Sequence, residues 1–259
     1  MNETAAGSQC TVLWHADDLK VSHVDGNVNE QVLDRLNMRC GKETPLTVTR
    51  GDIHECLGMT IDYGTAGKVI TQMDDYVENM LDEAPDDMSG TATTPAAAYL
   101  FKVDETSEDL NQEGSDLFHS VTAKLLFPCK RARPDTQTPM AFLCTQVMKP
   151  DIEDCNKLRR VVNCLRGSKQ MCLTLEADDL QVIKWWIDAS FAVHKDMRGH
   201  TGEKMSLGKG CVCSTSIRQK LTAKSSTEAE LVGVDDVMPM VLWTRQFMEE
   251  QGRVVKDNI

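Results

Sequence analysis

The C-terminal third of the chain places an acidic residue on each of three successive predicted elements, a strand, a helix and a second strand. Residues 182–187 are a run of β-branched and aromatic residues, which predicts a strand that ends at Asp188. A helix is predicted to carry Glu230, and Gly252 follows it as a C-terminal glycine should. Residues 254–257 then read as a short strand ending in Asp257. Carboxylates are the ligands that hard divalent cations prefer, so Asp188, Glu230 and Asp257 are expected to share Mg²⁺ or Mn²⁺.

The position of Glu230 on its helix is the physical basis of this expectation. At about 100° per residue, one arc of the helix collects most of its apolar residues, and Glu230 lies inside that arc. Its members are Leu231, Val234, Val237, Met238, Val241, Leu242 and Met248. A carboxylate on an apolar face needs a metal, a cation or a proton, because an unpaired buried charge is costly. A salt bridge to a neighbouring Lys or Arg is the structural alternative.

Several motifs of this region resemble a known family. They are residues 186–189 (WIDA), Gln219-Lys220, residues 225–231 (SSTEAEL), Leu242-Trp243 and Asp257-Asn258. Together they resemble the ribonuclease H domain of copia-type retrotransposon Pol polyproteins. The resemblance implies that Asp188, Glu230 and Asp257 are three of that family's four metal-binding acids. The fourth acid would lie beyond Ile259.

The N-terminal half carries a second resemblance, to the palm of a reverse transcriptase. Residues 11–22 (TVLWHADDLKVS) predict a strand, a turn with two acids and a second strand. This pattern is similar to the catalytic hairpin, in which Asp17 and Asp18 would hold magnesium ions for the primer end and the incoming nucleotide. Simple turn chemistry also explains an Asp-Asp pair. Residues 54–59, 124–127, 131–135 and 158–167 resemble the segments that follow in the same family, in the same order.

The chain departs from the family pattern at identifiable positions. His15 stands where an aromatic residue is expected before the acid pair, and Cys56, Cys155 and Cys164 also occupy aromatic positions. The fingers and the first palm strand, with the third acid of the polymerase site, would lie upstream of Met1. Each of the two implied sites is therefore short of one acid, and polymerase activity is expected to be lost.

The charge distribution separates one segment from the rest of the chain. The formal net charge is −12, but residues 119–170 carry 10 basic and 4 acidic side chains. A polymerase thumb or connection helix that follows a duplex backbone explains this pattern, and a solvated basic face explains it equally simply. The candidate contacts to an RNA–DNA hybrid or another nucleic acid are Lys124, Lys130, Arg131, Arg133, Lys157, Arg159, Arg160 and Arg166.

Composition limits the remaining possibilities. No apolar run approaches a membrane span, and the N-terminus lacks the basic start and apolar core of a signal peptide. We therefore expect an intracellular protein, cytoplasmic or nuclear, with no membrane partner and possibly the rest of a Pol polyprotein as a partner. The ten cysteines are scattered without a Cys-x-x-Cys pair, which favours reduced thiols over disulfides or zinc.

The sequence predicts an α/β protein in four parts. Residues 1–84 are expected to form a partial reverse transcriptase palm, and residues 85–118 an acidic linker or long loop. Residues 119–170 are expected to form a helical, basic thumb or connection segment, and residues 171–259 a truncated ribonuclease H-like mixed sheet with helices. The function expected is that of a reverse transcriptase and ribonuclease H remnant. The alternatives are a catalytically dead fragment that at most binds nucleic acid through residues 119–170, and a fragment that does not fold stably.

Overall fold

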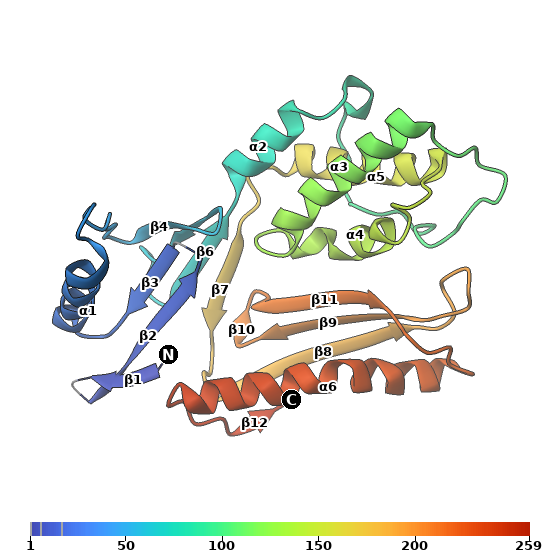
Figure 1. The fold of residues 1–259 in the computed structure, drawn as a ribbon. Coiled ribbons are helices and arrows are strands. Elements are labelled where there is room, and N and C mark those ends of the chain that lie inside the picture. Colours follow the sequence, from blue (N-terminus) through green and yellow to red (C-terminus); the bar gives the residue numbers. More distant parts are fainter. Residues whose placement is uncertain (1, 6, 17) are drawn as a thin grey trace.

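A computed structural model describes residues 2–5, 7–16 and 18–259. The described chain is a mixed α/β structure with three separate sheets and six α-helices (Figure 1). The helices α2 to α5 gather into one body, and the C-terminal sheet lies between this body and the long helix α6. None of the described helices is both long enough and apolar enough to cross a membrane.

The N-terminal residues form a three-stranded antiparallel sheet. It contains β1 (Asn2–Ala5), β2 (Ser8–His15) and β3 (Asp18–Ser22), and β2 and β3 form the predicted hairpin. Helix α1 (Gly26–Cys40) follows, and the Asp25 side chain caps it by accepting a hydrogen bond from the Asn27 amide. Among the described residues, no strand of this sheet is hydrogen-bonded to a strand of the five-stranded sheet that follows in the chain.

The second sheet has five strands and joins distant parts of the chain. Its order is β10-β7-β6-β5-β4, with β4 (Ile53–Cys56), β5 (Met59–Asp62), β6 (Lys68–Gln72), β7 (Leu173–Ala177) and β10 (Gly208–Lys209). Strands β5 and β6 form an antiparallel hairpin. Strand β7 pairs with β6 from Lys68↔Glu176 to Thr71↔Leu173. The sheet therefore crosses the domain boundary expected at residue 171.

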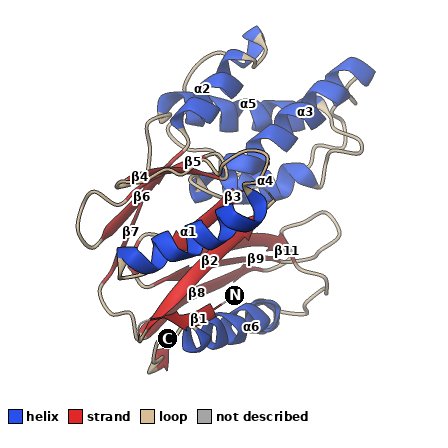
Figure 2. Ribbon diagram, turned by 60° about the vertical axis from the view of Figure 1, so that its left-hand side comes forward, coloured by secondary structure: helices blue, strands red, loops and turns tan. Residues whose placement is uncertain are grey.

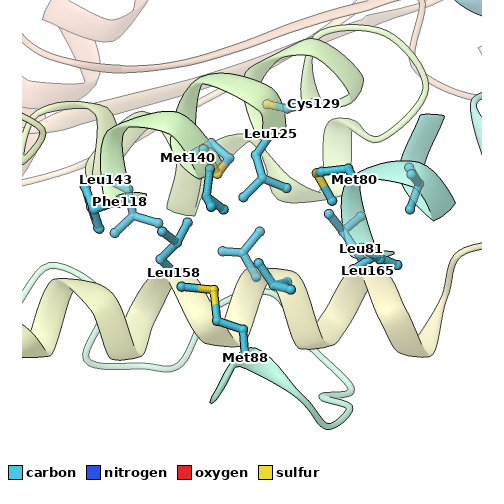
Figure 3. Close-up of a cluster of buried hydrophobic side chains, with 14 of the residues drawn as sticks. Met80, Leu81, Met88, Phe118, Leu125, Cys129, Met140, Leu143, Leu158 and Leu165 are labelled. Carbon is cyan, nitrogen blue, oxygen red and sulfur yellow. The ribbon is translucent and has the colours of Figure 1, made fainter. Parts of the chain in front are cut away.

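The helical body contains the largest hydrophobic core. It is built from α2 (Asp74–Asp82), α3 (Gln112–Cys129), α4 (Gln137–Cys144) and α5 (Ile152–Gly167), with short 3₁₀ turns at Asp86–Met88 and Pro134–Thr136. Phe118, Leu125, Met140 and Leu158 meet at its centre (Figure 3). Met88 and Leu100, from the segment expected to be a linker, are also buried in this core. Up to Asn111 that segment is a long loop packed on the helices, and its last residues belong to α3.

The C-terminal sheet has four strands in the order β11-β9-β8-β12. Its strands are β8 (Val182–Ser190), β9 (His200–Ser206), β11 (Cys213–Arg218) and β12 (Asp257–Asn258), and β12 runs parallel to β8 while the other pairs are antiparallel. Helix α6 (Ser226–Glu250) covers one face, and α4 contacts β11 on the other (Figure 2). Ile183, Met205 and Val255 form a small core between the sheet and α6, with Met248 packed against it.

Candidate functional site

Strand register fixes the face on which each residue of β8 lies. Ala189 pairs with Thr201, and both lie under Gly233 of α6, where an added Cβ would stand 3.3 Å from the Ala189 Cβ. Side chains alternate between the two faces of a strand, so Asp188 leaves the sheet on the face opposite α6. Its partner across the ladder is Gly202, which has no side chain. Asp188 is exposed and has open space beside it.

The first turn of α6 is held against the sheet by buried polar contacts. Gln219 is fully buried, and its Nε2 donates to Thr201 Oγ1 at 3.0 Å and to the Ala229 carbonyl at 2.8 Å. Ser225 caps the helix by accepting from the Glu228 amide, while Glu228 Oε2 accepts from the Lys224 amide at 2.7 Å. Glu228 is therefore engaged in capping. Gln219 is the positioning residue of this end of the helix, and the Gln219-Lys220 motif was its only signal in the sequence.

The predicted orientation of α6 is only partly correct, because Val237 is buried and Met248 packs against the core but most of the predicted apolar arc is exposed. The buried residues are Ala229, Gly233, Val237 and Thr244, whereas Leu231 is 66% exposed and Leu242 is 54% exposed. Glu230 is also exposed and does not lie on the buried face. The helix has apolar residues on every side, and its small residues face the sheet because they allow the backbone to approach closely.

Asp257 does not lie beside Asp188. In the parallel pairing of β12 with β8, Asp257 is opposite Val182 and Asn258 is opposite Ile183. The Trp185 amide donates to the Ile259 carbonyl, which fixes the same register. Asp188 is six residues further along β8, about 20 Å away at roughly 3.3 Å per residue. Both acids lie on the same face of the sheet. Asp257 is paired with Val182, and Asp188 is six positions further along β8, which is an even step in the alternation of side chains.

The three acids are therefore not assembled into a metal site in this structure. Among the described residues, no group of three or more His, Cys, Asp or Glu side chains is placed to hold a metal ion. Asp18 is likewise not part of any such group. It is exposed at the start of β3 and lies opposite His15 in the β2–β3 ladder. Asp17, the other acid predicted for the palm hairpin, lies outside the described residues. The hairpin contacts the second sheet through Lys20, whose Nζ lies 4.1 Å from the centre of the Tyr63 ring.

Most of the basic residues predicted to bind nucleic acid have partners inside the protein. Arg133 is 2% exposed and pairs with Asp135 at 2.7 Å, and its guanidinium also reaches the Ser168 carbonyl at 3.0 Å. Lys157 is buried and donates to the Lys102 carbonyl at 2.7 Å. The remaining pairs are Lys124–Glu83, Arg159–Asp87 and Arg160 with the hydroxyl and carbonyl of Thr94. Lys130, Arg131 and Arg166 form no ion pair within the described parts of the chain.

A buried histidine pair at the junction of the helical body and the C-terminal sheet has no counterpart in the sequence-based prediction. His194 and His200 are each 6% exposed, and their facing nitrogens are 3.0 Å apart. His200 Nε2 lies 2.7 Å from Ser216 Oγ, which donates in turn to Thr138 of α4. Burial, with a smaller contribution from the nearby His194, lowers the pKa of His200 to about 4. Burial also lowers the pKa of His194, assisted by Arg218.

Comparison with known proteins finds that the chain is similar, at low identity, to proteins of transposons. One relative is the retrovirus-related Pol polyprotein from transposon TNT 1-94 of Nicotiana tabacum, 24% identical over 216 residues. That match covers 81% of this chain but only 16% of the polyprotein. Another relative, described as "Putative transposon Ty5-1 protein YCL074W" of Saccharomyces cerevisiae, is 22% identical over 226 residues, which are 86% of this chain and 71% of that protein. No family model and no solved structure matches the chain.

Proposed function

We propose that this chain is a retrotransposon-derived Pol fragment in which a partial reverse transcriptase palm and thumb precede a ribonuclease H-type unit. Its similarity to transposon Pol proteins along most of its length supports this origin. The β2–β3 hairpin supports the palm assignment. Further support comes from the four-stranded order β11-β9-β8-β12 with one parallel edge, and from the helix that starts beside β8 with Glu230 in its second turn.

The observation that carries the functional conclusion is the register of β12. The resemblance implies Mg²⁺ or Mn²⁺ held by Asp188, Glu230 and Asp257, but the three carboxylates do not fit one ion when Asp257 is opposite Val182. A carboxylate cage of the expected kind needs its acids close together. We therefore infer that this conformation does not cleave RNA in a hybrid, and that Asp188, Glu230 and Asp257 act together only if β12 moves.

Hydrolysis of a labelled RNA–DNA hybrid tests this proposal. The purified chain should give no cleavage in Mg²⁺ or Mn²⁺ above that of a matched Asp188→Asn variant. Primer extension on an RNA template should also be absent, with Asp18→Asn as its control. Metal-dependent cleavage by the wild-type chain that is lost in Asp188→Asn would show that an active site assembles, and the inactive assignment would then be wrong.

Nucleic-acid binding without catalysis is the second candidate function. It is favoured by the exposed Lys130 and its neighbour Arg131 at the end of α3, which carry positive charge that no ion pair within the described chain neutralises. Each phosphate contact releases counterions, so binding through these residues should weaken steeply with salt. Fluorescence anisotropy of a labelled hybrid should show weaker binding and a flatter salt slope in a Lys130→Ala, Arg131→Ala variant. Unchanged binding in that variant would remove the support for this candidate.

A further inference from the structure

The ordered loop between α2 and α3 presents one threonine to a basic helix. Thr94 is exposed and precedes Pro95, at a point where the chain forms neither helix nor strand. Arg160 of α5 donates from Nη2 to Thr94 Oγ1 at 2.8 Å and from Nε to the Thr94 carbonyl at 3.1 Å. The Thr94 hydroxyl itself donates to the Ala96 carbonyl at 3.0 Å. A guanidinium thus already lies within hydrogen-bonding distance of a solvent-accessible hydroxyl.

The surroundings of Thr94 carry surplus positive charge. A cavity of about 250 Å³ lies between this loop and α5, and Lys157, Arg159 and Arg160 all contribute to its lining. Arg159 is paired with Asp87 at 2.9 Å, and Lys157 with Asp154 at 3.7 Å. Arg160 forms no ion pair within the described chain, so its charge is balanced only by neutral oxygens of Thr94. An anion attached at Thr94 would find an unmatched guanidinium and room beside it.

We propose that Thr94 is a phosphorylation site whose phosphate is captured by Arg160. In the modification step, a protein kinase that accepts threonine followed by proline transfers the γ-phosphoryl group of ATP to Thr94 Oγ1. The bond between the γ-phosphorus and the bridging oxygen breaks, ADP leaves, and the hydroxyl proton passes to the kinase. The product carries a charge of about −1.5 to −2 and three strong acceptor oxygens, which an arginine can bind in a bidentate manner. This inference is independent of the proposed function.

The chain contains its own comparison sites. Threonine precedes proline at Thr44 and Thr138 as well as at Thr94. Thr44 is exposed in a loop, where no arginine contact to it occurs within the described chain, and Thr138 lies in the first turn of α4 with its hydroxyl bonded to Ser216. Of the three threonines, Thr94 and Thr44 are both accessible to a kinase, but only Thr94 has an arginine beside it in the described chain that could bind the phosphate.

Phosphorylation of the purified full chain by a proline-directed serine/threonine kinase, followed by peptide mapping, tests the modification. Thr94 should be modified, Thr94→Ala should remove that signal, and Thr44→Ala should leave it. If Thr94 stays unmodified while Thr44 is modified, the site assignment is wrong.

Titration of the phosphate by ³¹P resonance tests its capture. The second pKa of the Thr94 phosphate should lie about 0.5 unit or more below that of a phosphorylated peptide of residues 89–100, because the guanidinium favours the dianion. Arg160→Gln should restore the peptide value while leaving the modification intact. The peptide serves as the reference even if Arg160→Gln fails to fold. Equal pKa values in the wild-type chain and the peptide would refute capture.

Discussion

Acidification should destabilise the protein through His200. The pKa of this buried side chain is about 4, against an ordinary value of 6.5 that it regains in the unfolded chain. Between these two values the unfolded state binds a proton that the folded state does not, so stability falls as the pH falls from 6.5 to 4. At about 1.4 kcal/mol per pKa unit, the full loss is roughly 3 kcal/mol. Above pH 6.5 both states are neutral at this ring and the effect disappears.

Urea unfolding at a series of pH values from 7.5 to 4.5 measures this loss. His200→Gln should lower stability at every pH, because His194 and Ser216 both lose the imidazole ring that lies between them, but it should flatten the dependence on pH below 6.5. His119→Gln is the matched control, since His119 is exposed on α3, and it should leave the dependence unchanged. Parallel pH profiles for the wild type and His200→Gln would show that the buried pair does not resist protonation, and the argument would fail.

Three further predictions concern the C-terminal sheet and α6. Gln219→Met should destabilise the chain by about 1–3 kcal/mol, because the Thr201 hydroxyl and the Ala229 carbonyl would both lose a buried donor, and Lys220→Met at the exposed next position should have little effect in the same urea titration. Gly233→Leu should lower the melting temperature through overpacking of about 1–3 kcal/mol against Ala189, whereas Val234→Leu on the exposed side should be tolerated. Burial raises the pKa of Glu203, so its contribution to stability falls as the pH rises through that pKa. Glu203→Gln should therefore become more stable relative to the wild type between pH 5 and pH 8, and the prediction is refuted if the difference in urea midpoint between the two proteins is the same at both pH values.

The sequence predicted local elements well because their signals are local. The hairpin at residues 11–22, the strand that carries Asp188 and the helix that carries Glu230 all depend on neighbouring residues, and all are present, although the strand continues to Ser190. The face of α6 could not be predicted in this way. Leu231 and Leu242 are more apolar than Ala229 and Gly233, yet the small residues face the sheet because close approach of two backbones requires them there.

The candidate site was predicted less completely because it depends on contacts between distant segments. Net charge marked residues 119–170 as basic, but Glu83 and Asp87 from before that segment neutralise Lys124 and Arg159. The order of strand, helix and strand around Asp188, Glu230 and Asp257 was apparent in the sequence, whereas the register of a two-residue parallel strand was not. The pairing of His194 with His200 likewise depends on how the chain returns from β8 to β9.

The sharing of one sheet by early and late strands makes the two halves of the chain interdependent. A protein truncated after residue 170 would lose β7 and β10, and β6 would become the edge of the remaining sheet. The exposed ladder of β6 includes Val69, Ile70 and Thr71, a β-prone stretch of the kind that recruits strands from other molecules. Expression of the N-terminal half alone should therefore yield aggregates, and a protease that cuts between β6 and β7 should leave two pieces that stay associated under native conditions.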